Sequence, residues 1–395
     1  MFKFAALPPL SLYIHFPWCV RKCPYCDFNS HEAKQAIPER DYIDALIADL
    51  EQDLPVVWGR PVMSIFMGGG TPSLFSAESI DRLLSAVRAR LPLSPEAEIT
   101  LEANPGTAEQ GKFTEFRAAG VNRLSIGVQS FQQDKLERIG RIHGRREALR
   151  AAEMAHDAGF ENFNLDLMFG LPQQTLAEAI SDIETALALE PSHISHYQLT
   201  IEPNTLFAHQ PPTLPDDESQ WDMQQHCQDR LAARGYTHYE VSAYARGGKQ
   251  CRHNLNYWRF GDYLGIGAGA HAKISSAQHQ SINRTSKLRS PRDYLLHAAS
   301  GRRVDTQRAL GRDDVGLEFM MNALRLTEGF ATDVFAAHTG LPIGSVEAPL
   351  REAEARGWIE WDLHAMRPTL MGQRYLNDLL GLFLPEEDLC STKPT

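Results

Sequence analysis

The sequence contains few cysteines, no excess of basic residues and no long apolar run. No stretch approaches the roughly 20 consecutive apolar residues that a membrane-spanning helix needs. Residues 1–6 lead straight into a strand-like run and do not resemble a secretory signal peptide. We therefore expect a cytoplasmic protein that is not an integral membrane protein. The hydrophobic fraction of 43% and the charged fraction of 23% are typical of a globular chain.

The charge balance argues against a nucleic-acid partner. The chain has 39 lysines and arginines against 50 aspartates and glutamates, so its formal net charge is -11. Proteins that bind the phosphate backbone need clustered basic side chains. We therefore expect no nucleic-acid ligand.

The cysteines are too few for a disulfide framework, since only 6 occur among 395 residues. Cys227, Cys251 and Cys390 are scattered along the chain. The other three form the pattern Cys19-x3-Cys23-x2-Cys26, directly after a strand-like run. In a reducing compartment, a cluster of this kind indicates a metal site.

Two metals are compatible with three close thiolates. A structural zinc site needs four ligands, usually as two close pairs, and His15 or Asp27 could in principle complete one. Alternatively, three thiolates hold three irons of a four-iron cubane and leave the fourth iron open. An open iron can chelate the amino and carboxylate groups of S-adenosylmethionine (SAM) and reduce its sulfonium to a 5'-deoxyadenosyl radical. The spacing resembles that of the radical-SAM superfamily, so we favour iron.

The first half of the chain alternates between strand-like and helix-like segments. This alternation predicts βαβ units and a parallel sheet, here an α/β fold of the incomplete (β/α)6 barrel type. Ligand-binding residues in such folds gather at the C-terminal ends of the strands. The expected strands are 10–16, 62–67, 98–103, 123–128, 162–169 and 194–201, and the expected helices are 40–54, 77–91, 109–119, 147–158, 176–189 and 219–234.

The second half is less regular. A further strand is expected at 239–244, a glycine-rich turn at 265–270 and a polar loop at 277–292. Helical periodicity returns after 312, most clearly at 315–326, and 357–361 with 366–369 resemble a small β wing. The expected domains are a partial barrel at 1–235, a connecting region at 236–304, a smaller helical, winged-helix-like C-terminal domain at 305–384, and a tail at 385–395.

Polar and glycine residues follow several of the expected strands. A glycine-rich turn, Gly68-Gly69-Gly70-Thr71-Pro72, allows close approach of a ligand to the backbone, although such turns are common. A carboxylate at a strand end can simply cap a helix, but one flanked by apolar residues needs a partner if it is buried. Together these side chains could supply acceptors for ribose hydroxyls and an arginine fork for a carboxylate. They are Glu102, Gln129, Arg141 and Asp166.

These motifs together resemble the oxygen-independent coproporphyrinogen III oxidase family, over nearly the whole chain. The positions that recur are Tyr13, the cysteine triad, Gly69, Gly70, Thr71, Glu102, Gln129, Arg141 and Asp166. The resemblance implies that they contact the cluster or SAM and that the glycine loop holds the SAM amino group. It also implies that Tyr25 packs against the adenine.

Departures from that family point to a subgroup. Phe28 stands where the oxidases carry a fourth cysteine, and only 18 residues precede Cys19. Residues 253–258 read HNxxYW, a pattern that resembles the HemW-type heme chaperones. Histidine can ligate heme iron, tyrosine and tryptophan can stack on a porphyrin, and asparagine can fix the imidazole tautomer. The residues concerned are His253, Asn254, Tyr257 and Trp258, which could otherwise form an aromatic core loop; Cys251 is taken as a bystander.

The resemblance therefore predicts a heme chaperone. It implies a [4Fe–4S] cluster, SAM, heme and an acceptor hemoprotein, such as a respiratory one. The alternative is radical-SAM oxidative decarboxylation of coproporphyrinogen III to protoporphyrinogen IX. A third possibility is a radical-SAM enzyme that acts on another substrate. The oligomeric state stays open.

Overall fold

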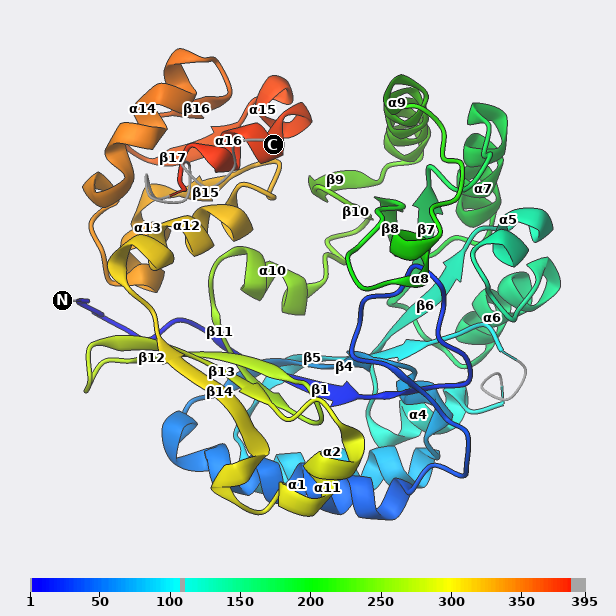
Figure 1. Ribbon diagram of the computed structural model, residues 1–395, viewed down its shortest axis with the longest axis horizontal. Coiled ribbons are helices and arrows are strands. Elements are labelled where there is room, and N and C mark those ends of the chain that lie inside the picture. Colours follow the sequence, from blue (N-terminus) through cyan, green and yellow to red (C-terminus); the bar gives the residue numbers. More distant parts are fainter. Residues whose placement is uncertain (1, 107–110, 385–395) are drawn as a thin grey trace.

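The computed structural model describes residues 2–106 and 111–384. Its main feature is a 12-stranded sheet with the order β14-β13-β12-β11-β1-β4-β5-β6-β7-β8-β10-β9 (Figure 1). The six strands expected in the first half are all present and lie side by side. The expected tail at 385–395, with Cys390, lies outside the described residues. The central parallel strands are β11 (Asp262–Ile266), β1 (Leu10–Phe16), β4 (Val62–Gly69), β5 (Leu93–Ala103), β6 (Arg123–Gln129), β7 (Phe163–Phe169) and β8 (His193–Gln198).

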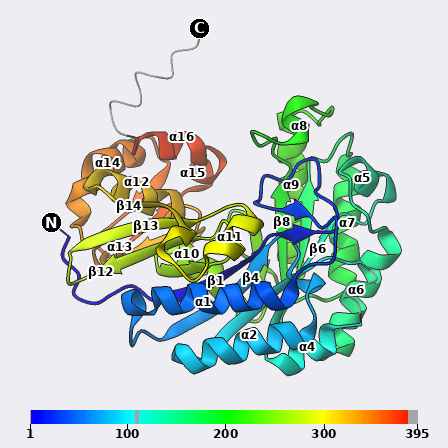
Figure 2. The ribbon, with the colours of Figure 1, turned by 60° about the horizontal axis from the view of Figure 1, so that its bottom comes forward.

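Helices cover the outer face of the parallel strands (Figure 1), and Figure 2 shows α1 and α2 running along this face. The strands are buried along most of their length, as is usual for a parallel sheet covered on both faces. β1, for example, has six buried residues and one half-buried residue. The outer helices are α1 (Glu39–Val57), α2 (Ala77–Arg90), α4 (Phe113–Ala119), α5 (Gln133–Arg138), α6 (Arg145–Asp157), α7 (Leu176–Ala188) and α9 (Asp217–Ala233).

The helix starts follow local capping rules. The Ser76 hydroxyl accepts a hydrogen bond from the Ser79 backbone N–H at the start of α2. At the start of α7, Thr175 and Glu178 form a capping box. These caps fix where α2 begins after β4 and where α7 begins after β7.

The region from 236 to 304 is part of the same sheet. β11 pairs in parallel with β1, and β12 (His271–Ser276), β13 (Ser281–Lys287) and β14 (Val304–Ala309) continue antiparallel beyond it. The polar loop expected at 277–292 is therefore wrong in its central part, where residues 281–287 form β13. Polar residues form this strand because β12 and β14 satisfy its backbone from both sides. At the opposite edge, β9 (Thr237–Glu240) and β10 (Ala243–Ala245) form a hairpin beside β8.

The remaining residues form the small helical domain that was expected, with its own apolar core. Its wing contains β15 (Phe330–Ala331), β16 (Ile359–Trp361) and β17 (Ala365–Pro368). Phe2 and Phe260, from outside this domain, join its core and tie it to the sheet. Its helices are α12 (Arg312–Ala323), α13 (Thr332–Thr339), α14 (Glu347–Ala355), α15 (Leu370–Arg374) and α16 (Leu376–Gly381).

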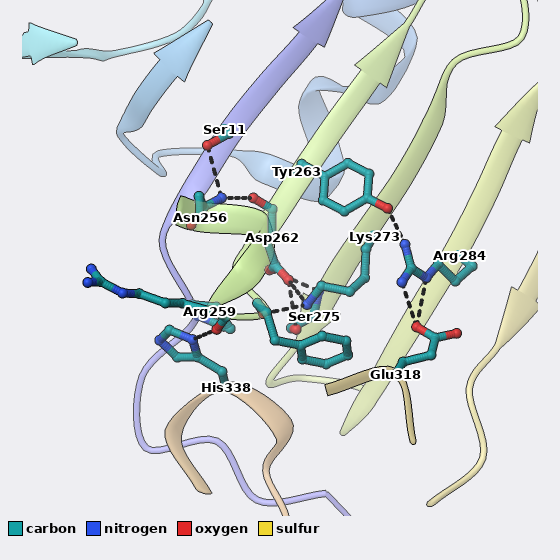
Figure 3. A network of polar contacts seen from close by, with 12 residues as sticks. Ser11, Asn256, Arg259, Asp262, Tyr263, Lys273, Ser275, Arg284, Glu318 and His338 are labelled. Carbon is teal, nitrogen blue, oxygen red and sulfur yellow. Dashed lines mark hydrogen bonds and ion pairs between the residues drawn. The ribbon is translucent and has the colours of Figure 1, made fainter. Parts of the chain in front are cut away.

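A polar network crosses from the sheet to this C-terminal domain (Figure 3). Fully buried Asp262 forms an ion pair with Lys273 Nζ at 3.0 Å and accepts a hydrogen bond from the Ser275 hydroxyl at 2.9 Å. Further along the sheet, Arg284 contacts the Tyr263 hydroxyl and pairs with Glu318 of α12. The position of the C-terminal domain is thus set by charged contacts as well as by apolar packing.

A second buried ionic cluster joins α1 to the end of β13 and the chain segment that follows it. Fully buried Asp49 accepts hydrogen bonds from Lys287 Nζ at 2.6 Å, Arg303 Nε at 2.8 Å and the Tyr294 hydroxyl at 2.7 Å. It also accepts one from the Gly267 N–H at 3.1 Å. A single carboxylate therefore holds together residues that are more than 200 positions apart in the sequence.

Candidate functional site

The three clustered cysteines line one cavity of about 510 Å³ at the C-terminal ends of the parallel strands. They follow β1 in a loop that includes the short strands β2 (Trp18–Cys19) and β3 (His31–Glu32). The Thr71 hydroxyl donates to Cys19 Sγ at 3.5 Å, and Arg141 Nη1 donates to Cys23 Sγ at 3.6 Å. Burial raises the pKa of the Cys19 and Cys26 thiols, so a positively charged metal centre would be needed to favour their thiolates.

The donor set fits an iron–sulfur cubane held by three thiolates. Among residues 2–106 and 111–384, no three His, Cys, Asp or Glu side chains converge as ligands of one metal ion. A cubane does not need such convergence, because each thiolate binds a different iron. Three thiols on one cavity wall, with space beside them, are the arrangement that such a cluster requires.

The glycine turn after β4 is built against the chain segment that precedes Cys19. The Gly70 N–H donates to the Phe16 carbonyl at 2.6 Å, and the Thr71 N–H donates to the Trp18 carbonyl at 2.8 Å. A Cβ atom on Gly70 would lie 2.5 Å from that Trp18 oxygen, so no larger residue fits. This turn therefore fixes the cysteine loop and leaves Gly69, Gly70 and Thr71 on the cavity wall.

The strand-end residues expected at the site lie together on the same cavity. Glu102 accepts a hydrogen bond from the Gly69 N–H at 3.1 Å, and Asp166 accepts one from Asn164 Nδ2 at 2.8 Å. Gln129 adopts a positive φ of 71° and accepts a hydrogen bond from the Tyr197 hydroxyl. The expected residues that line this cavity are Tyr25, Gly69, Gly70, Thr71, Glu102, Gln129, Arg141 and Asp166.

Several cavity residues were not singled out from the sequence. Asn104 bridges the site, because it accepts a hydrogen bond from Arg141 Nη2 at 2.6 Å and donates one to the Thr71 hydroxyl at 2.8 Å. Tyr197 and Gln198, at the end of β8, also line the cavity. The rule that ligands gather at strand ends also favours Tyr197, because it lies near the C-terminal end of β8.

Two carboxylates share the cavity, and both have a raised pKa. Burial raises the pKa of Glu102 to about 8, and the nearby charge of Asp166 adds to this effect. Burial also raises the pKa of Asp166, although hydrogen bonds from Asn164 and Ser125 oppose the shift. In the ligand-free protein, Glu102 is therefore mostly protonated at neutral pH.

We expect Glu102→Gln to stabilise the ligand-free protein more as the pH rises. The unfolded carboxyl group loses its proton near pH 4.5, but the folded one keeps it up to about pH 8. The wild-type free energy of unfolding therefore falls across this window, and the variant lacks that loss. Because Glu102 lines an open cavity, we expect a difference of only about 1–2 kcal/mol at pH 8. Chemical denaturation at several pH values measures it, with Glu96→Gln on the exposed surface as the control; equal pH profiles for wild type and Glu102→Gln would contradict it.

The HNxxYW segment forms helix α10 (Arg252–Trp258), which packs against β1, β4, β11 and α12. His253 is only 2% exposed; its Nδ1 lies 3.0 Å from the Ser64 hydroxyl, and its Nε2 is enclosed without a hydrogen-bond partner. The Trp258 ring lies under the Arg325 guanidinium, with 4.3 Å between the ring centroid and the guanidinium carbon. Asn254 is half-buried on the same helix. The assignment of these residues as heme contacts therefore stays a prediction. In this arrangement the His253 ring is buried.

Tyr257 of the same motif lines a second cavity, of about 650 Å³. Tyr13, expected at the SAM site, also lines this second cavity and not the first. The two cavities share Asp27, Phe28, Gly69 and Glu102 as wall residues. The HNxxYW helix and the cysteine loop thus face neighbouring spaces with a common wall.

Asn29 fastens the cysteine loop to the far end of the sheet. Its Nδ2 donates to the carbonyls of Ala268 and Arg289, each at 2.9 Å. Its own carbonyl lies 2.9 Å from His15 Nε2. Gly269 has a φ of +80°, and a Cβ atom there would lie 2.3 Å from the Asn29 amide nitrogen. The glycine is therefore needed for this attachment.

None of the helices within the described residues is long and apolar enough to span a bilayer.

Residues 13–186 match the Radical SAM superfamily, and residues 310–375 match the HemN C-terminal domain. The solved structure of coproporphyrinogen III oxidase (HemN) from Escherichia coli superposes with a TM-score of 0.80 at 24% identity, over 95% of this chain and 90% of that one. This likeness establishes the fold.

Sequence relatives narrow the assignment. Heme chaperone HemW of Escherichia coli (strain K12) is 53% identical over 380 residues, which span 96% of this chain and 99% of that protein. Heme chaperone HemW of Haemophilus influenzae is 50% identical over 385 residues, with 96% and 99% covered. With identity this high along nearly its whole length, the chain belongs to the HemW family of radical-SAM proteins.

Proposed function

We propose that this protein is a cytoplasmic heme chaperone, which binds heme, a [4Fe–4S] cluster and SAM and transfers the heme to an acceptor hemoprotein. One observation carries this proposal. Tyr257 of the HNxxYW motif lines the second cavity, which shares a wall with the thiol-lined cavity, the one that contains Cys19, Cys23 and Cys26. A heme in the second cavity would lie beside the cluster and SAM site. Both relatives are named heme chaperones, which supports the same function.

The thiol-lined cavity has the groups that a cluster and SAM require. Cys19, Cys23 and Cys26 would hold three irons, and the open iron of such a cluster supplies SAM binding and one-electron reduction. The raised-pKa carboxyl of Glu102 offers a hydrogen-bonding group beside the glycine turn. Arg141 offers a guanidinium that could pair with a ligand carboxylate.

Departures from the oxidase pattern favour chaperoning over porphyrinogen oxidation. Phe28 is 57% exposed and lines both cavities, at the position where the oxidases carry a fourth cysteine. An aromatic ring at this wall offers a face for a flat ligand. The acceptor is proposed to be a hemoprotein, for example one of a respiratory chain.

A heme titration tests this function. We expect anaerobically reconstituted protein, with its cluster intact, to bind one heme per chain saturably, as followed by Soret absorbance. Incubation with an apo-hemoprotein should then move the heme to that acceptor. The absence of saturable binding would overturn the proposal. Formation of a vinyl product from coproporphyrinogen III, with SAM and a reductant, would favour the oxidase instead.

A further inference from the structure

The second cavity has the size and the walls of a site for a flat conjugated ligand. Its volume of about 650 Å³ lies within the usual range of roughly 300–1,000 Å³ for small-molecule sites. Aromatic rings from four parts of the chain line it, namely Tyr13, Phe28, Tyr257 and Tyr263. The Tyr257 and Tyr263 rings lie 4.3 Å apart between centroids, so α10 and β11 form one continuous aromatic surface.

Two histidines reach this cavity, but only one has free ring nitrogens. His15 is 5% exposed, and its nitrogens lie 2.9 Å from the Tyr13 hydroxyl and 2.9 Å from the Asn29 carbonyl. His271, the first residue of β12, is exposed, and its ring makes no hydrogen bond to any residue that the structure describes.

A cation for an acidic substituent lies on the same wall. Arg289 lines the cavity with an exposed side chain, and its guanidinium forms no ion pair within the described part of the chain. Its main-chain carbonyl accepts the hydrogen bond from Asn29 Nδ2. An arginine fork of this kind suits a carboxylate such as a heme propionate.

His253 does not offer the same chemistry in this conformation. Its Nδ1 lies against Ser64, and its Nε2 is enclosed near the rings of Phe66 and Tyr257. Helix α10 would have to move before this imidazole could reach an iron. The motif therefore contributes Tyr257 to the cavity wall, with His253 packed behind that ring.

We propose that the second cavity is the heme site, that His271 is the axial ligand of the heme iron and that Arg289 binds a propionate. This inference rests on the proposed chaperone function. It places the tetrapyrrole against Phe28 and Tyr257, beside the wall shared with the cluster and SAM cavity. It assigns the iron ligand to a residue outside the HNxxYW motif.

Heme titrations of matched histidine variants test the ligand assignment. We expect His271→Ala to weaken heme binding at least tenfold and to lose the imidazole-ligated spectrum, while iron and sulfide content stays unchanged. Added imidazole should restore that spectrum. His279→Ala, on the exposed turn between β12 and β13, is the control and should match wild type. His253→Ala should keep the imidazole-ligated spectrum.

The propionate assignment has its own test. We expect Arg289→Gln to weaken the binding of heme severalfold but not the binding of heme dimethyl ester, which lacks the free carboxylates. Wild-type affinity and spectrum in His271→Ala would overturn the ligand assignment while leaving the chaperone function intact. A wild-type protein that binds no heme would instead overturn the function itself.

Discussion

Replacing any one of the three clustered cysteines with serine is expected to abolish the iron–sulfur cluster. Among the described residues, the thiol-lined cavity has no cysteines other than Cys19, Cys23 and Cys26. No further thiol is therefore in place to replace one that is lost. Two thiolates hold a cubane poorly, and serine oxygen is a much poorer ligand for iron. Iron and sulfide should fall from about four of each per chain to near zero after anaerobic reconstitution.

The matched control is Cys227→Ser. Cys227 is a fully buried free thiol on α9 that lines neither cavity. This variant should keep the iron and sulfide content of wild type, even if the buried hydroxyl lowers stability slightly. Unchanged iron and sulfide in any of the three triad variants would contradict the assignment of the cluster to these residues.

Asp49→Ala is expected to lower the free energy of unfolding by about 3–5 kcal/mol, because it leaves buried cations without their main partner. Lys287 and Arg303 are both buried and pair with Asp49; Asp53, which is partly exposed, would be their one remaining carboxylate among the described residues. The Tyr294 hydroxyl and the Gly267 N–H would also lose an acceptor.

Urea denaturation followed by circular dichroism measures this loss. The control is Asp44→Ala, which removes an exposed carboxylate from the same helix α1 and its surface pair with Arg82. Exposed pairs contribute only about 0–1 kcal/mol, so the control should lie close to wild type. Equal stabilities for the two variants would show that the buried cluster is not needed for folding.

The strands and helices of the first half could be predicted because their sequence periods are strong. The expected strand at 10–16 coincides with β1, and the expected helix at 77–91 ends one residue beyond α2. Most of the polar cavity residues could also be predicted, since they lie on or just after expected strands and parallel strands end at one edge of the sheet. Local pattern and topology together were sufficient there.

Long-range pairing and burial could not be read in the same way. The parallel contact between β11 and β1 joins residues about 250 positions apart, and no local period reveals it. The strand β13 is polar and was expected as loop, because its stability comes from neighbours on both sides. The HNxxYW motif predicted that His253 contacts heme. Only the fold shows that His253 is enclosed and that His271 lines the second cavity.

The attachment of Asn29 has a consequence for the order of events during protein synthesis. The carbonyls that hold its amide belong to residues 239 and 260 positions later in the chain. A nascent chain that has emerged only as far as β8 contains all three clustered cysteines and the glycine turn, but it lacks the two carbonyls that hold Asn29. The second attachment of the loop, through Asn29, can form only after Arg289 has left the ribosome. We therefore expect the cysteine loop to reach its fully attached form only when most of the chain has been made.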